Sequence, residues 1–197
     1  KKRTGYTKGR GISDKVAIAE HLACFDAQLQ KALAAGQSSF TLSSAHLKFP
    51  KVFDLMHHPR ILAYVRDLLG PELIGLASHY FCKLPKDGTT ISWHQDASYW
   101  PLSPSKTATV WLAIDDVDMD NGPMTVIPGS HLHGQIPFEH STEQERNVLG
   151  QSVRDPLRWG REPVPFTRRA GQISLHPELL QPGPEPNRPA RRPCGRT

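Results

Sequence analysis

The residues whose types and spacing could do chemistry are His94 and Asp96, within the sequence Trp93-His94-Gln95-Asp96. Residues 91–95 are predicted to be extended, and side chains two residues apart on a strand point to the same face. An imidazole and a carboxylate on one face could bind one metal ion. Two histidines with one carboxylate form a ligand set for non-haem iron(II) that leaves coordination positions open. A His-x-Asp tripeptide is unspecific by itself, because a chain with ten histidines often contains one by chance.

Three segments around and beyond this tripeptide resemble the phytanoyl-CoA dioxygenase family in sequence, order and spacing. They are WHQDASYW at 93–100, TVWLAIDD at 109–116 and NGPMTVIPGSH at 121–131. The resemblance runs from about Phe53 to Arg192. It implies a double-stranded β-helix, or jelly roll, with the site in the mouth of the barrel. It also implies an oxygenase that uses Fe(II), O2 and 2-oxoglutarate as co-substrate to hydroxylate a small organic molecule while 2-oxoglutarate is decarboxylated.

The resemblance assigns roles to single residues. His94 and Asp96 would be two of the three iron ligands. Trp111 would line the 2-oxoglutarate pocket, although packing in the core explains a tryptophan equally well. Three residues are expected to flank the substrate entrance, with packing as the alternative for the two aromatic ones: Gln95, Tyr99 and Trp100. His131 would form hydrogen bonds in a structural loop and would not bind the metal.

The last part of the chain departs from the family pattern. The family has a histidine here, the third iron ligand, and further on an arginine that pairs with the far carboxylate of 2-oxoglutarate. Pro182 stands in place of the histidine and Pro193 in place of the arginine, and Pro184 and Pro189 stand where serines are usual. Proline offers neither a nitrogen lone pair nor a positive charge, so these roles are lost.

Neighbouring residues could substitute for the missing groups. Arg191 or Arg192 could reach 2-oxoglutarate, with a solvated basic tail as the alternative. His176 precedes Pro182 by six positions. On one continuous strand this separation is about 20 Å, too far for a ligand with a bond of about 2 Å. We therefore predict two ligands at most, weak iron binding and negligible turnover for the chain as written.

Three explanations of the prolines remain open. Each replacement needs only one base change, so an error in the sequence near its end would explain them and would leave an active oxygenase. A decayed copy without activity is the second explanation. The third, and the alternative function, is a non-catalytic jelly-roll binding protein that has lost its metal. Asp96 argues against a halogenase, because such enzymes replace the carboxylate ligand.

The other elements must position these residues within one domain, 1–197, that we expect to be α+β. A loop at 1–12 is expected to precede a helical part at 13–70, jelly-roll strands at 71–181 and a Pro/Arg-rich irregular end at 182–197. The missing initiator methionine and the missing final barrel strand of the family suggest truncation at both ends.

Within these parts, hydrophobic periodicity predicts a helix that Ser13 begins and Gly36 ends, and a second helix at 59–69. Strands are predicted at 73–84, 91–95, 107–114, 124–127, 164–167 and 172–176. The polar segment 138–162 is expected to be an excursion with a short helix at 143–149. Alternation at 107–114 places Thr109 and Trp111 on one face and Val110, Leu112 and Ile114 on the other.

Composition excludes several classes of function. The net charge of +5 comes largely from the two ends of the chain, without interleaved aromatic residues, so we expect no nucleic-acid partner. No apolar run is long enough to span a membrane. Cys24, Cys82 and Cys194 are odd in number and far apart, which fits buried thiols and a reducing, cytoplasmic setting. The sequence indicates neither the substrate nor the oligomeric state.

Overall fold

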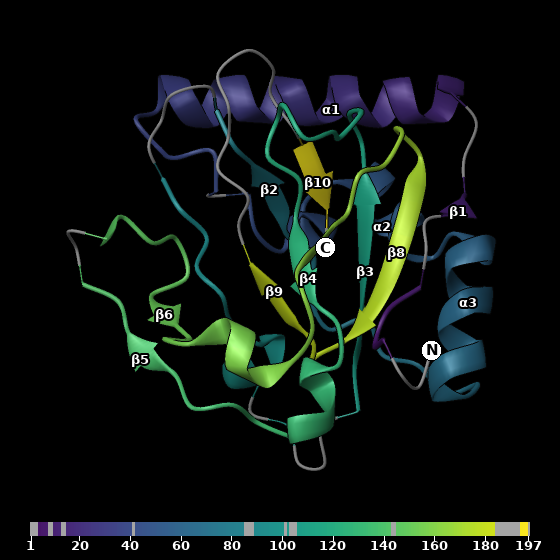
Figure 1. The fold of residues 1–197 in the computed structure, drawn as a ribbon. Coiled ribbons are helices and arrows are strands. Elements are labelled where there is room, and N and C mark those ends of the chain that lie inside the picture. The colour runs from purple at the N-terminus through teal and green to yellow at the C-terminus, as the bar shows by residue number, and fades with distance from the viewer. Residues whose placement is uncertain are drawn as a thin grey trace.

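The computed structural model describes residues 4–7, 10–12, 15–40, 42–84, 89–100, 102, 106–142, 145–183 and 194–196. Helices dominate the first part of the chain and short strands the rest, so the predicted mixture of helix and sheet is confirmed (Figure 1). None of the helices in this described part is both long and apolar enough to cross a membrane.

The long helix α1, Lys15–Ala34, follows the predicted hydrophobic periodicity. Its buried stripe includes Ile18, Phe25 and Leu29. The helix ends just before Gly36, which has a φ of 71° that a residue without Cβ adopts at little cost. The expected cap Ser13 lies outside the described residues.

Two shorter helices follow α1. Helix α3, Pro59–Leu69, has the predicted bounds, with proline in its first turn and His58 accepting a hydrogen bond from the Arg60 amide. Helix α2, Pro50–Met56, was not predicted, because seven residues are too few to show a clear period. A short 3-10 helix, η1 (Ala45–Leu47), packs against α2.

The larger sheet has five strands in the order β1 (Arg10–Gly11), β8 (Gln172–Pro177), β3 (Ala108–Ala113), β10 (Cys194–Arg196) and β2 (Tyr80–Cys82). All neighbouring pairs are antiparallel. Two of these strands correct the prediction, since β1 lies in the expected loop at 1–12 and β10 in the expected irregular end. Both are only two or three residues long, and their pairing depends on partners distant in the sequence.

A smaller sheet has the order β7 (Val164–Pro165), β4 (Thr125–Ile127) and β9 (Gln181–Gly183). Pro182 lies within β9 and is paired with Val126, so the irregular end expected at 182–197 is wrong for residues 182 and 183. A strand at the end of the sheet order tolerates proline, because it needs donors on one side only.

The segment between β4 and β7 forms an excursion, as predicted. Its strands β5 (Glu139–His140) and β6 (Gln151–Ser152) pair with each other. Of the helix predicted at 143–149, residues 143–144 lie outside the described residues, Glu145 is in 3-10 conformation, and residues 146–149 are turn or bridge and not helix. The described chain has further short helices, among them η3 (Ser130–His133) and η5 (Pro156–Trp159).

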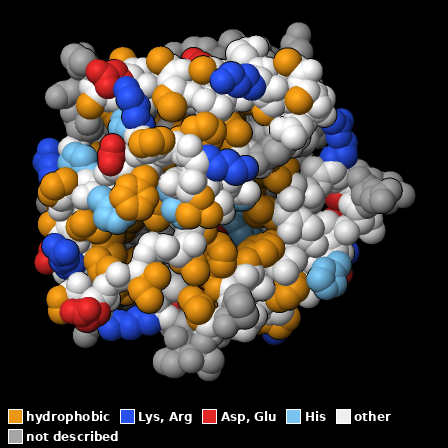
Figure 2. Space-filling model, turned by 180° about the vertical axis from the view of Figure 1, so that it is seen from behind, with side chains coloured by type: hydrophobic (Ala, Val, Ile, Leu, Met, Phe, Trp, Pro, Cys, Tyr) orange, Lys and Arg blue, Asp and Glu red, His pale blue; other side chains and the backbone are white. Residues whose placement is uncertain are grey.

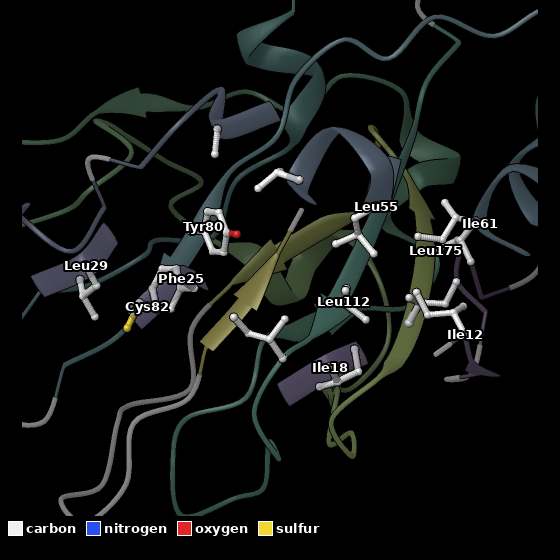
Figure 3. Packing of buried hydrophobic residues seen from close by; sticks show 14 residues of the cluster. Ile12, Ile18, Phe25, Leu29, Leu55, Ile61, Tyr80, Cys82, Leu112 and Leu175 are labelled. Atoms are coloured by element: carbon white, nitrogen blue, oxygen red, sulfur yellow. The ribbon is translucent and has the colours of Figure 1, made fainter. Parts of the chain in front are cut away.

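The main core lies between the helices and one face of the larger sheet (Figure 3). Phe25 of α1 stacks on Tyr80 of β2 at a ring-centroid distance of 4.6 Å. Leu112 of β3 and Leu175 of β8 join the same cluster, which confirms the predicted face of 107–114. Cys82 is fully buried there, as expected, and Cys24 is half-buried; both are free thiols.

The opposite face of the larger sheet carries a second, small cluster of Trp111, Ala113 and Val117. The smaller sheet contributes a third cluster that contains Val126 and Leu180. Met124 packs against both of these clusters. The two sheets are therefore joined on the side that faces away from the helices.

Two predicted strands are shorter in the structure or are not formed. Of residues 73–84 only Tyr80–Cys82 is a strand, with an isolated bridge at His79, and 72–78 has no regular structure. Residues 91–95 join no regular ladder among the described strands, although Gln95 has extended dihedral angles.

Candidate active site

The side chains of His94 and Asp96 converge, as the sequence predicts. Nε2 of His94 lies 3.5 Å from Oδ1 of Asp96. The expected reason was wrong, because Asp96 does not continue a strand but begins the 3-10 helix η2 (Asp96–Tyr99). The change from extended backbone to helix directs the carboxylate toward the imidazole.

His94 is buried and its ring is oriented by the backbone. Nδ1 donates a hydrogen to the carbonyl oxygen of Ser92 at 2.8 Å. Because the carbonyl can only accept, Nδ1 carries a hydrogen, and Nε2 is the ring nitrogen that faces Asp96. A metal-binding histidine is oriented in this way in many proteins.

The other carboxylate oxygen of Asp96, Oδ2, lies close to two side chains of the larger sheet. The hydroxyl of Thr109 donates to Oδ2 at 2.6 Å, and Nε2 of His176 lies 3.7 Å from the same oxygen. Burial disfavours the charged carboxylate, but the interactions with His176 and His94 outweigh it and hold the pKa of Asp96 well below its usual value. Asp96 is therefore ionised at neutral pH.

His176 is the residue of this cluster that the sequence prediction missed. It lies on β8 directly opposite Thr109 of β3, so the two side chains share a face. The distance argument against it assumed one strand from 176 to 182. Instead the chain turns after Pro177, whose carbonyl accepts the amide hydrogen of Leu180, and continues in the other sheet. Pairing the predicted strands 107–114 and 172–176 would have revealed it.

Pro182 lies beside His94. Its carbonyl oxygen accepts the backbone N–H of His94 at 3.1 Å. The position that the family pattern reserves for a third ligand is thus next to the other two, but proline provides no donor atom. Among the described residues, no group of three His, Cys, Asp or Glu side chains is arranged to hold a metal ion. The described residues therefore supply two candidate metal ligands and do not fit a complete iron centre.

Trp111 is buried on β3, on the same face as Thr109. It packs with Ala113 and Val117 and lies opposite Ser174 of β8. Both earlier expectations, core packing and lining a co-substrate pocket, are compatible with this place.

Gln95 is buried, and its amide is fully engaged within the protein. Nε2 donates to the carbonyl oxygens of Gly134 and Leu179, and Oε1 accepts from the Ile136 amide. These bonds tie three loops together. They favour a structural role over the expected contact with a substrate.

Tyr99 lies between His94 and a pocket. Its ring lies edge-on to His94, at a centroid distance of 6.1 Å, and its hydroxyl donates to the Leu149 carbonyl. Burial and the nearby charge of Asp96 raise the pKa of Tyr99 to about 12, so the phenol stays protonated. Tyr99 lines a pocket of about 710 Å³ together with Phe40 and His79. Trp100 is half-buried at the end of η2, outside the residues that line it.

The other predicted residues do not join this cluster or cannot be placed. His131 lies in η3 with its ring against Gly5, where an added Cβ would come within 2.4 Å of Nδ1. Arg191, Arg192 and Pro193 lie outside the described residues, as do Pro184 and Pro189.

The face opposite to that of Figure 1 is mostly hydrophobic and uncharged. Among the described residues, Figure 2 shows lysine and arginine side chains scattered over this face and not gathered in one patch.

Comparison with known proteins gives consistent matches. Residues 16–194 match the family model of phytanoyl-CoA dioxygenase. The mouse phytanoyl-CoA dioxygenase domain-containing protein 1 is 30% identical over 143 residues, which is 68% of this chain and 47% of that protein. The probable alpha-ketoglutarate-dependent hypophosphite dioxygenase of Stutzerimonas stutzeri is 27% identical over 74% of this chain and 51% of its own length. The chain thus spans about half the length of these relatives.

Solved structures agree with the family match. The non-heme monooxygenase ThoJ superposes with a TM-score of 0.79 at 26% identity, covering 98% of this chain and 72% of ThoJ. The carbocyclase SnoK, at 22% identity and a TM-score of 0.77, supports the fold alone and covers 99% and 79% of the two chains. Since the family model covers most of the sequence, this chain belongs to the phytanoyl-CoA dioxygenase family.

Proposed function

We propose that this chain is the core of a non-haem Fe(II)- and 2-oxoglutarate-dependent oxygenase that hydroxylates a small organic substrate, with His94 and Asp96 as iron ligands. One observation carries the proposal: Nε2 of His94, whose Nδ1 is held by a backbone carbonyl, lies 3.5 Å from the Asp96 carboxylate in a protein of this family. Iron, when bound, supplies the oxidising chemistry, and the chain's own residues hold and orient its ligands.

The arrangement of the sheets supports a jelly-roll architecture for a single domain, 1–197. His94 is bonded through its backbone to β9 of the smaller sheet. Asp96 is bonded to β3 of the larger sheet. A site between two antiparallel sheets is what a double-stranded β-helix provides.

The substrate would enter through the pocket beside Tyr99. The described lining combines apolar and uncharged polar groups such as Phe40, Asn147 and Leu149 with two basic residues, His79 and Arg146. Pockets of this volume take small organic molecules. The cysteine usage of the chain supports a reducing, cytoplasmic location.

The chain as written is proposed to be a poor catalyst. Pro182 occupies the third ligand position, so iron would be held by two side chains only. This observation also favours the second candidate function, a jelly-roll protein that binds its ligand without catalysis.

Anaerobic titration with Fe(II), followed by assay of succinate formation from 2-oxoglutarate, separates the two candidates. For the chain as written we expect weak iron binding and negligible succinate. Pro182→His should strengthen iron binding by more than about tenfold, since a gain of only about 1.4 kcal/mol has this effect. Pro182→His combined with Pro193→Arg should then produce succinate, and adding Asp96→Ala should abolish it.

Pro165→His is the matched control, because Pro165 lies in the smaller sheet on β7, on the other side of β4 from Pro182. It should leave iron binding unchanged. Robust succinate formation by the chain as written would contradict the assignment of Pro182. If Pro182→His and Pro165→His bind iron equally weakly, the binding-protein function is preferred.

A further inference from the structure

The two carboxylate oxygens of Asp96 have different surroundings. Oδ1 faces Nε2 of His94 at 3.5 Å. Oδ2 accepts the Thr109 hydroxyl at 2.6 Å and faces Nε2 of His176 at 3.7 Å. One oxygen is thus directed to the metal-binding imidazole, and the other is directed to two groups of the larger sheet.

We infer that Thr109 and His176 are positioning residues that hold Oδ2 of Asp96 and so present Oδ1, beside His94, to a divalent metal ion. The inference rests on the proposed metal-binding role of His94 and Asp96. It goes beyond that role in assigning two further residues and in predicting that the carboxylate binds through one oxygen.

The two residues are well placed to impose an orientation. They are direct partners across the β3–β8 pair, which lies inside the five-stranded sheet. Thr109 has a branched Cβ with few side-chain rotamers, and His176 is only 3% exposed. Asp96 itself begins a four-residue 3-10 helix after an irregular segment. Its carboxylate therefore gains its orientation from the sheet and not from its own backbone element.

The hydrogen-bonding capacity of His176 supports the same role. In the described part of the chain Nδ1 of His176 has no hydrogen-bond partner, so the ring makes its polar contact through Nε2. Nε2 is therefore the ring nitrogen that can hold Oδ2 in place. Groups that fix a ligand through its second polar atom commonly change metal affinity when they are removed.

The test is a titration with Co(II), followed by its visible absorption, in the chain as written and in Pro182→His. Thr109→Val keeps the shape of the side chain but removes the hydroxyl, and should weaken Co(II) binding about ten- to hundredfold. Thr109→Ser restores a hydroxyl and should restore most of the affinity. His176→Gln keeps an N–H donor and should weaken binding less than His176→Ala.

Thr125→Val is the matched control. Thr125 is fully buried on β4, and its hydroxyl has no hydrogen-bond partner in the described structure. The same substitution there should leave Co(II) affinity unchanged, and thermal unfolding without metal verifies that each variant is folded.

The outcomes distinguish this inference from the proposed function. Equal Co(II) affinity in Thr109→Val, Thr125→Val and the parent protein would overturn the positioning role and leave the metal site in place. Loss of affinity in Thr109→Ser as well as in Thr109→Val would also overturn it, since the hydroxyl would then not be responsible. Absence of Co(II) binding in both parents would overturn the inference and the metal site together.

Discussion

At the scale of single residues, one or two contacts determine the surroundings of each of two histidines, His94 and His79. The carbonyl of Ser92 sets the orientation and tautomer of His94. His79, in contrast, stacks on Phe81 at a ring-centroid distance of 5.0 Å beside the pocket. Burial lowers the pKa of His79, although a backbone hydrogen bond to Phe40 opposes the effect. The neutral form of His79 is therefore the one that the fold accommodates.

This preference predicts a pH dependence of stability. Because the pKa of His79 is lower in the folded state than the ordinary histidine value of 6.5, the unfolded chain binds the proton more readily. The contribution of His79 to stability is complete above the unfolded pKa and is lost as the pH falls through it toward the folded pKa. His79→Phe should lose less stability than the parent between about pH 7 and pH 5, around the unfolded pKa of about 6.5.

Urea unfolding at several pH values measures this effect as the difference in free energy of unfolding between the two proteins. Carboxylates and other histidines titrate in both proteins and cancel in the difference. A difference that stays constant from pH 8 to pH 5 would contradict the prediction, and that range brackets the unfolded pKa of about 6.5.

At the scale of elements, local patterns predicted α1, α3 and β3, because their periodicity and end signals lie within each segment. Strands that exist through distant pairing, such as β1 and β10, have no comparable local signal. The same limitation hid His176, whose place beside Asp96 depends on a turn and on the pairing of two strands. His94 and Asp96 were found because their motif is contiguous.

The close packing of Gly183 on β9 against the Trp93 ring predicts that this glycine is needed for stability. A Cβ at Gly183 would come within 2.2 Å of the Trp93 ring, so Gly183→Ala must displace the ring or the strand. We expect a loss of about 1–3 kcal/mol in the free energy of unfolding, the usual cost of overpacking. Gly11→Ala on β1 is the control, since nothing lies within 4 Å of its added Cβ.

Chemical denaturation of the two variants compares the costs directly. Gly11→Ala should change the free energy of unfolding by no more than about 0.5 kcal/mol. Equal stabilities for the two variants would mean that the Trp93 ring moves aside without a cost in free energy of unfolding, which would contradict this prediction.

At the scale of the whole molecule, the helices and the site lie on opposite faces of the larger sheet. Phe25 and Tyr80 belong to the helical side, and Thr109, Trp111 and His176 to the other. The family and its oxygenase chemistry could be inferred from the sequence, since they depend on contiguous motifs. The relation of the two sheets could not, because Met124 and Pro182 connect segments that are far apart in the chain.

Stability of the whole molecule should depend on the helical side. Phe25→Ala removes a fully buried ring that stacks on Tyr80 and should cost about 3–5 kcal/mol in free energy of unfolding. Phe53→Ala, at a residue that is 49% exposed, is the control and should cost much less. Differential scanning calorimetry gives both values, and similar melting temperatures for the two variants would show that the helical core is not the main source of stability.

The segment 92–96 contacts both sheets, with His94 bonded to β9 and Asp96 bonded to β3. The side chains of His94 and Asp96 keep their mutual distance only while the two sheets keep theirs. Mutations that loosen the packing around Met124 would therefore change the distance between His94 and Asp96 without replacing either residue. Sequence changes at the contact between the two sheets would therefore be constrained by the geometry of the proposed site.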